Sequence, residues 1–195
     1  MHPFNVALKP RAPVFFVLAF LAILVCPPIN KAVSFFGLPG CVAVFSVFGL
    51  LFWIVDRWAW RLPWLTKAFG TPNLSGVWAV TGETNGADGI PRSWSGNVTI
   101  VQHWTSMAIS MATEESGSSS TMSSLEVVPG RGVRLMYGFT NERVGQKGSL
   151  NDHQGTCNVL FDESLSSATA FYFTGHGRST VGSMTWTRSK KESRE

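Results

Sequence analysis

Two long apolar runs near the N-terminus constrain this chain more than any other feature. They span Pro13–Ile29 and Ala32–Val55, and a membrane-spanning helix needs roughly 17 to 25 mostly apolar residues. Proline lacks the N–H that a continuing helix would use, so Pro27 and Pro28 are expected to end the first helix. A short turn over about Pro28–Val33 would follow. The sequence therefore predicts two N-terminal transmembrane helices.

A cleaved signal peptide is the alternative interpretation of residues 1–26. Lys9 and Arg11 would form its basic segment and Val14–Cys26 its apolar segment. The prolines after Cys26 make a poor cleavage site, and a second apolar run follows within a few residues. We therefore favour two membrane spans.

The basic residues around the two runs predict their orientation. Lys and Arg in short flanking segments stay in the cytoplasm, and only Lys31 lies between the runs, whereas the others flank them: Lys9, Arg11, Arg57, Arg61 and Lys67. Both termini, and the soluble part with them, are expected to be cytoplasmic.

Four tryptophans lie close together at the end of the second run: Trp53, Trp58, Trp60 and Trp64. Indole rings concentrate at membrane interfaces, where the ring lies among acyl chains and its N–H reaches water. The alternative is that they belong to a soluble core. We predict that they mark the cytoplasmic interface of the membrane.

The net charge of +4 does not indicate a nucleic-acid binder. Residues 1–69 carry six basic residues and one acid, a net charge of +5, whereas residues 70–195 carry ten against eleven, a net charge of −1. The basic excess therefore belongs to the membrane segment. The soluble part lacks the basic stripe of a duplex binder, so neither DNA nor RNA is expected as a partner.

The soluble part, residues 70–195, reads as short alternating segments separated by turn residues. Period-two alternation is typical of half-buried strands, and no segment between them is long enough for a helical crossover. Eight antiparallel strands are predicted, over about Leu74–Gly82, Ser93–His103, Thr105–Thr113, Ser118–Val128, Gly132–Thr140, Gln154–Asp162, Ala168–Gly175 and Val181–Arg188.

Eight antiparallel strands could form a sandwich or close as an up-and-down barrel, and we favour the barrel. A closed barrel has no exposed edges and can hold one small ligand. Gly76-Val77-Trp78 opens the first strand, as Gly-x-Trp does in lipocalins and avidins, where the indole plugs one end. Arg188 in the last strand could pack over Trp78 in a cation–π contact. The fold class is thus a membrane-anchored all-β protein, with an anchor over residues 1–69.

Alternation gives candidate interior residues. Gln102 shares one face of the second strand with Val98, Ile100 and Trp104, and an amide on an apolar face is either a satisfied core residue or a ligand contact. One face of the fifth strand carries Val133, Leu135, Tyr137 and Phe139. In the seventh strand Thr169, Phe171 and Phe173 oppose Ala170, Tyr172 and Thr174, and the register that would decide which face points inward is left open. The fourth strand carries hydroxyls on both faces, Ser118 and Ser120 among them, which fits either a solvated edge or a polar pocket.

No catalytic or metal-binding pattern stands out. His103, His153 and His176 fall on three different segments, without the spacing of a metal motif, and no Gly-x-Ser-x-Gly elbow occurs. We predict a protein that is not an enzyme and needs no cofactor or metal.

The order of the segments resembles a known family, the two-transmembrane, β-strand-rich effectors of bacterial cyclic-oligonucleotide antiphage signalling (CBASS). The resemblance rests on the two N-terminal runs, the Trp- and Arg-rich exit and the barrel segments LSGVW (Leu74–Trp78), VTIVQHWTSMAISMAT (Val98–Thr113), VRLMYGF (Val133–Phe139), HQGTCNVLF (His153–Phe161) and FYFTGHGRSTVGSM (Phe171–Met184).

The resemblance implies an inner-membrane receptor for a cyclic di- or oligonucleotide that a cognate nucleotidyltransferase makes on infection. The barrel would bind the ligand, the chains would form a homo-oligomer, and the helices would disrupt the lipid bilayer and kill the cell. Tyr137 and Tyr172 would stack on bases, Arg178 would pair with phosphate, and Gln102, Ser118 and Ser120 would bind polar edges.

Two other functions fit the same architecture. A membrane-anchored, lipocalin-like barrel could bind a lipid or another apolar molecule, and a solid barrel could act as a scaffold for another protein. The first would need an aliphatic interior, and the amide, tyrosine and serines speak against it.

Overall fold

The fold comes from a computed structural model, which describes residues 1–6, 11–37, 42–85, 90–114, 116–143, 153–175 and 179–189. The chain forms two compact units, one of Met1–Leu8 with Pro72–Glu195 and one of Lys9–Thr71. The expected division at residues 69 and 70 lies close to the second boundary. The first few residues, however, belong with the barrel and not with the anchor.

The first helix, α1 (Ala12–Phe35), passes through both prolines. The expectation that Pro27 and Pro28 end it is therefore wrong, as is the expected turn over Pro28–Val33. Prolines are tolerated in apolar helices where neighbouring groups take over the backbone hydrogen bonds that they free. Just beyond the prolines, the side chain of Asn30 donates to the Val42 carbonyl at 3.0 Å and accepts from the Val42 N–H at 2.6 Å. This clamp ties α1 beyond its prolines to the segment that leads into the next helix.

The second helix, α2 (Val44–Arg57), has 14 residues and is shorter than the expected span of Ala32–Val55. It rises about 21 Å, less than the roughly 30 Å of a bilayer core. Among the described residues, α1 is the one helix long and apolar enough to cross a membrane, with a mean hydropathy of 2.5. The predicted second membrane-spanning helix is therefore not confirmed. A 3₁₀ turn, η1 (Ala59–Arg61), and α3 (Pro63–Phe69) follow.

The tryptophans after α2 are not equivalent. Trp53, Trp58 and Trp64 are at least half exposed, as indoles at a membrane interface would be. Trp60, the fourth predicted interface residue, lies in η1 and is completely buried. Its ring is therefore a packing element and does not reach the surface.

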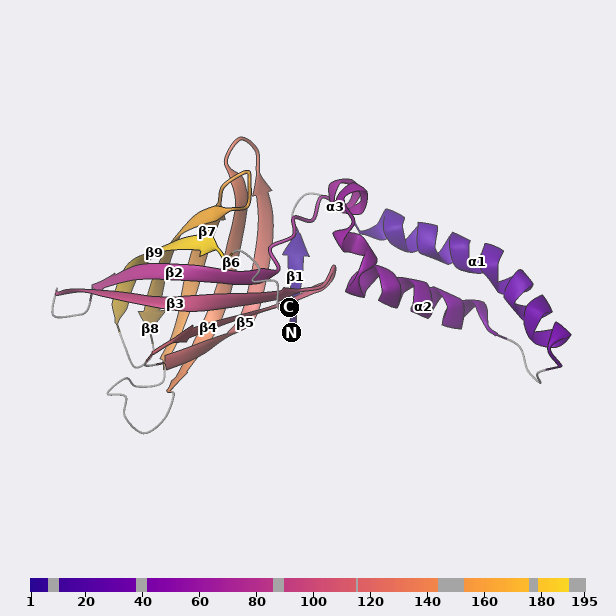
Figure 1. The fold of residues 1–195 in the computed structure, drawn as a ribbon, viewed down its shortest axis with the longest axis horizontal. Coiled ribbons are helices and arrows are strands. Elements are labelled where there is room, and N and C mark those ends of the chain that lie inside the picture. The colour runs from indigo at the N-terminus through magenta and orange to yellow at the C-terminus, as the bar shows by residue number, and fades with distance from the viewer. Residues whose placement is uncertain are drawn as a thin grey trace, which may run out of the picture. The chain divides into compact units, whose positions relative to one another are not determined.

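Eight strands form the closed meander that the alternation predicts (Figure 1). Each pairs antiparallel with its sequence neighbour, and the last pairs with the first, Trp78 lying opposite Arg188. The strands are β2 (Gly76–Asn85), β3 (Pro91–Gln102), β4 (Ser106–Thr113), β5 (Ser116–Val128), β6 (Gly132–Arg143), β7 (His153–Phe161), β8 (Ser167–Gly175) and β9 (Thr180–Arg188). The predicted antiparallel barrel is confirmed.

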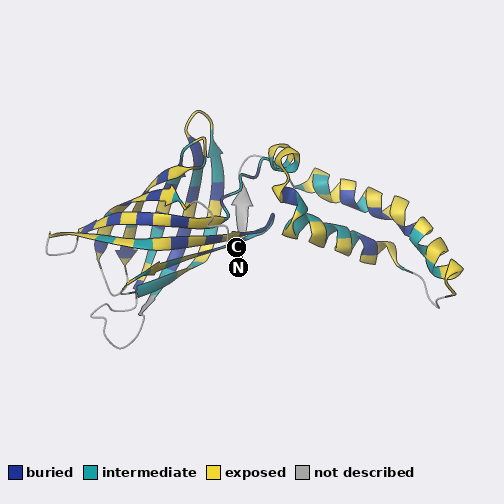
Figure 2. Cartoon of the chain, in the orientation of Figure 1, coloured by how far each residue is buried: buried dark blue, intermediate teal, exposed yellow. Residues whose placement is uncertain are grey.

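Burial alternates along most of these strands, most plainly along β2, where dark blue buried residues alternate with yellow exposed ones (Figure 2). The inward face of β6 carries Val133, Leu135, Tyr137 and Phe139, as predicted, and β3 buries Val98, Ile100 and Gln102. On β8 the register left open by the sequence is resolved: Tyr172 points inward and Phe171, 70% exposed, points outward.

A ninth strand, β1 (His2–Val6), was not expected from the sequence. It lies between β4 and β5, antiparallel to β4 at His2 and Met107 and parallel to β5 from Phe4 to Val6. β4 and β5 pair with each other directly only over Ser110–Ala112 and Gly117–Ser119. Where they separate, β1 supplies the backbone partners that an open seam would lack.

The first prediction concerns this seam. Deletion of His2–Val6 should leave backbone groups of β4 and β5 without partners, so the barrel should unfold at a lower temperature. Hydrogen exchange of the full chain in detergent should rise at the amides of Met107 and Ser123–Leu125. The amides of Val159 and Ala170, on the far strands, provide an internal control and should exchange as before. Unchanged exchange along β4 and β5 would contradict the role assigned to β1.

Candidate ligand-binding site

One end of the barrel is solid because aromatic side chains fill it. The Trp78 ring lies 4.9 Å from the Phe161 ring and 6.4 Å from the Trp186 ring, centroid to centroid. The Arg188 guanidinium covers Trp78 at 5.0 Å from the ring centroid, and donates to the carbonyls of Asn73 and Ser75 at 3.1 and 2.8 Å. The expected plug of Trp78 and Arg188 is thus present in the structure, and it also fixes the chain segment that enters β2.

Gln102 belongs to this plugged end. Its side-chain oxygen accepts a hydrogen bond from the Leu74 N–H at 2.9 Å, and its nitrogen donates to the Pro72 carbonyl at 3.0 Å. Both bonds hold the entry segment, and the residue is fully buried. Of the two interpretations of this amide, the structure therefore favours a satisfied core residue over a ligand contact.

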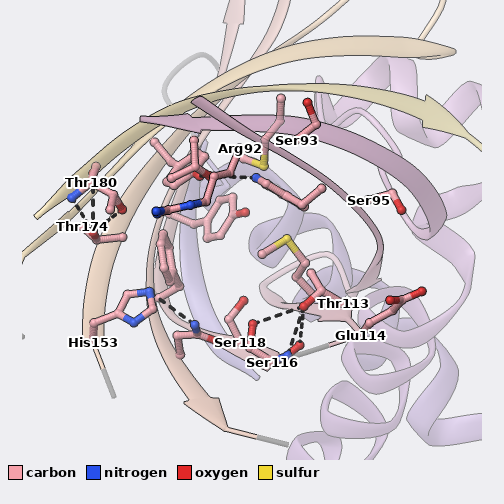
Figure 3. Close-up of a pocket in the computed structure, with 18 residues that line it drawn as sticks. Arg92, Ser93, Ser95, Thr113, Glu114, Ser116, Ser118, His153, Thr174 and Thr180 are labelled. Atoms are coloured by element: carbon pink, nitrogen blue, oxygen red, sulfur yellow. Dashed lines mark hydrogen bonds between the residues drawn. The ribbon is translucent and has the colours of Figure 1, made fainter. Parts of the chain in front are cut away.

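The other end of the barrel is hollow. A cavity of about 460 Å³ opens there and mixes hydroxyl, aromatic and charged side chains. Figure 3 shows Arg92 and Ser93 of β3 across the cavity from Ser116 and Ser118 of β5. Its volume falls within the range of roughly 300 to 1,000 Å³ that is usual for small-molecule sites.

An aromatic subsite, formed by Trp94, Tyr172 and Thr84, makes one side of the cavity. The two rings meet edge to face, with centroids 6.3 Å apart. The Trp94 Nε1–H donates to the Thr84 hydroxyl at 2.9 Å, and the same hydroxyl bonds to the Tyr172 hydroxyl. Thr84 thus holds both rings in place, and Tyr172 presents mainly its ring to a ligand.

Two glycines make room for these rings. A Cβ atom at Gly82 would overlap the Trp94 ring, and one at Gly182 would overlap the Tyr172 ring. Any larger residue there would displace the rings. The aromatic subsite therefore depends on glycine at both positions.

A polar subsite, formed by Asn141, His153 and Ser118, lies on neighbouring strands. Asn141 of β6 pairs with Ser118 of β5 on one side and with His153 of β7 on the other. The Asn141 nitrogen lies 3.3 Å from the His153 Nε2. The Asn141 Oδ1 is buried and has no hydrogen-bond partner among the described residues.

Tyr137 lies at the floor of the cavity, its ring 6.5 Å from the Trp186 ring of the plugged end, and Cys157 lies opposite it on β7. Burial raises the pKa of the Tyr137 hydroxyl well above its usual value, and the neighbouring thiol adds to this rise. Burial also raises the pKa of the Cys157 thiol to about 12, against the opposing effect of its hydrogen bond with Tyr137. Both groups are therefore neutral at physiological pH, and the floor carries no charge.

The predicted ligand residues are thus only partly brought together. Ser118, Tyr137 and Tyr172 line one cavity. Ser120 does not line it: its hydroxyl accepts from the Ile109 N–H at 2.9 Å and bonds to His2 Nε2 at 2.7 Å, so it belongs to the β1 seam. Arg178 lies outside the described residues.

Arg92, Trp94 and Asn141 line the cavity but were not predicted as ligand residues, although the alternation along their strands indicates that they point inward. Counting back by two from Val98 along β3 reaches Trp94 and Arg92, and counting forward from Phe139 along β6 reaches Asn141. These positions continue the inward faces that were recognised. Polar residues at the ends of strands resemble turn residues, so the inward faces were not extended to these positions.

Cation-binding clusters do not account for the cavity: within the described ranges, no group of three or more His, Cys, Asp or Glu side chains lies close enough to hold a metal ion.

The fold and the cavity together define a receptor for a small ligand, built as a closed barrel with one solid and one hollow end. Residues 69–188 match the family model of the Cap15 cyclic dinucleotide receptor domain. CD-NTase-associated protein 15 of Yersinia aleksiciae is 37% identical over 140 residues, which cover 72% of this chain and 66% of that relative. The chain belongs to the Cap15 cyclic dinucleotide receptor family. This membership confirms the predicted ligand class and supports the resemblance to CBASS effectors.

The second prediction separates the plugged end from the cavity. Gln102→Leu removes both bonds to the entry segment and leaves the buried Leu74 N–H without a partner, which should lower the free energy of unfolding by about 1–3 kcal/mol. Ligand affinity of the folded protein should not change. Gln154→Leu, at an exposed position on β7, is the matched control for thermal unfolding. A Gln102→Leu protein that keeps its stability but loses affinity for the ligand would show that Gln102 contacts the ligand.

Proposed function

We propose that this protein is an antiphage effector whose barrel binds a cyclic di- or oligonucleotide made by a cognate nucleotidyltransferase. Binding then drives homo-oligomerisation, and the N-terminal helices disrupt the bacterial inner membrane, so that the infected cell dies. The observation that carries this proposal is the hollow end of a barrel that belongs to the Cap15 receptor family.

The chemistry of the cavity suits such a ligand. Aromatic rings stack on bases with little dependence on their sequence, and Trp94 and Tyr172 provide two such surfaces. Arg92 brings a guanidinium to the same cavity, suited to a phosphate. Hydroxyl groups from three strands can bind ribose and base edges. A lipid would leave these polar groups without partners.

The helical unit suits a membrane. Large apolar side chains cover the outside of α1, with Phe16, Phe20 and Ile23 more than half exposed, and such a surface is stable in lipid and not in water. α1 and α2 pack through Ala22, Cys26 and Val47. We propose that they enter the bilayer as a hairpin, multi-pass, with both termini and the barrel cytoplasmic.

The short second helix offers a physical route to membrane disruption. An apolar helix shorter than the bilayer core thins the bilayer locally or associates with copies of itself, since either response reduces the mismatch. A ligand that favours the oligomer shifts the population toward it. Assembly would then concentrate many short helices in one patch of membrane.

The third prediction tests the receptor. Tyr172→Ala should weaken binding of cyclic dinucleotides by about tenfold or more. It removes one stacking surface and also the edge-to-face partner of the Trp94 ring. Isothermal titration of the full chain in detergent measures the affinity. Phe171→Ala, one residue away on the outer face of the same strand, is the matched control. Equal affinities for both variants would remove the cavity from the binding mechanism.

The fourth prediction tests the membrane step. The full chain in vesicles loaded with a self-quenching dye should release the dye when its cyclic dinucleotide is added, and chemical cross-linking should show larger assemblies. The Tyr172→Ala protein should release dye only at correspondingly higher ligand concentration. Saturable binding without dye release would refute membrane disruption and leave the receptor function standing.

A further inference from the structure

The two subsites of the cavity lie on opposite sides of the barrel and differ in chemistry. Counted around the barrel, β6 with Asn141 is four strands from β2 with Thr84. Thr84 belongs to the aromatic subsite and Asn141 to the polar subsite, and both lie near the ends of their strands at the cavity. One chain therefore presents two different environments to a ligand that carries two bases.

The aromatic subsite has no hydrogen-bonding group committed to a base edge. The Trp94 N–H and the Tyr172 hydroxyl both bond to Thr84. What remains for a base is the faces of the rings and one hydroxyl proton of the Thr84–Tyr172 pair. Every base has a face that stacks, and a hydroxyl can turn to donate or to accept, so neither group distinguishes one base from another. This subsite should accept either base without reading its substituents.

The polar subsite holds a hydrogen-bond acceptor that nothing satisfies. The Asn141 nitrogen lies 3.3 Å from His153 Nε2. The Asn141 Oδ1 is buried and has no hydrogen-bond partner among the described residues. A buried acceptor left unpaired costs about 1–3 kcal/mol. Asn141 lines the cavity, so a turn of its amide toward the cavity would let a ligand N–H reach the oxygen and recover this penalty. The amide of asparagine pairs with adenine in this manner, through the exocyclic amino group.

We propose, given the receptor function above, that Asn141 selects one base of the ligand by accepting a hydrogen bond from its exocyclic amino group, while the aromatic subsite holds the other base by stacking alone. The receptor thus reads one base and tolerates the other. A ligand with two different bases binds as well as a symmetrical one, provided that one base carries the amino group.

Three synthetic cyclic dinucleotides test this: one with two adenines, one with an adenine and an unsubstituted purine, and one with two purines. Adenine and purine differ only in the exocyclic amino group. The first two should bind with affinities within about twofold, since the mixed ligand can bind in the one orientation that places its adenine at Asn141 and loses only the statistical factor of about two. The third should bind about 10- to 100-fold more weakly.

The variants assign the effect to Asn141. In Asn141→Leu the three affinities should converge to within a few-fold. Asn158→Leu, at an exposed position on neighbouring β7, should keep the wild-type pattern. If Asn141→Leu does not fold, Asn141→Ser serves in its place, because serine is too short to occupy the position of Oδ1.

The outcomes are distinguishable. A stepwise loss with each amino group removed would mean that both bases are read, and would overturn the inference. A wild-type pattern in a folded Asn141 variant would overturn it as well. Failure of the wild type to bind any of the three would overturn this inference, and failure to bind cyclic dinucleotides of any base composition would overturn the receptor function as well.

Discussion

The aromatic plug around Trp78 determines where this barrel can hold a ligand. A barrel of eight strands has an interior that side chains can fill or a small ligand can occupy, and here each takes one end. Trp78, Phe161 and Trp186 fill one end, and Arg188 seals it by covering the indole and binding the carbonyls of the entry segment. With that end packed, the remaining inward positions are free to carry smaller and more polar residues. The Trp94 and Tyr172 rings can line the cavity because they lie over Gly82 and Gly182, which have no side chains to displace them.

The sequence predicted the barrel well because its determinants are local. Each strand carries its own period-two pattern, and each connection its own turn residues, so Tyr137 could be grouped on one face with its apolar neighbours, whereas Ser118 could not be placed. Gln102 shows where this reasoning stops. Its burial was predictable, but its partners, Leu74 and Pro72, lie about thirty positions earlier, and alternation does not reveal what a buried amide meets. The same limit separates Ser120, at the seam, from Ser118, in the cavity. Both serines lie on the same face of β5, before the bulge between Ser120 and Met122. They differ in their place along the strand, since Ser120 binds His2 of β1, and the sequence gives no hint of β1.

Features that depend on distant pairing were missed. β1 has five residues and no alternating pattern to distinguish it from a terminal tail, and its partners are more than a hundred positions away. α1 runs through Pro27 and Pro28, and Asn30 just beyond them binds Val42, a polar clamp inside an apolar segment that local propensity does not reveal. In both cases tertiary contacts outweigh a local rule, as expected where a backbone group can find a partner elsewhere.

The position of β1 bears on how ligand binding can reach the helices. Val6 pairs with Leu125, and Gly76 with Ile100, so both chain connections to the helical unit leave the barrel at its plugged end, away from the cavity. A ligand can act on the helices only if it binds two arrangements of the barrel with different affinity. The seam between β4 and β5 is suited to such a difference. At its cavity end Met111 pairs with Ser118, and both line the cavity, while at its other end the same two strands hold β1, which leads directly into α1. A ligand that tightens the β4–β5 pairing at one end changes the width of the gap that β1 occupies at the other. The eight-stranded meander alone is connected to the helical unit only through the segment that enters β2, whereas β1 adds a second connection at the β4–β5 seam.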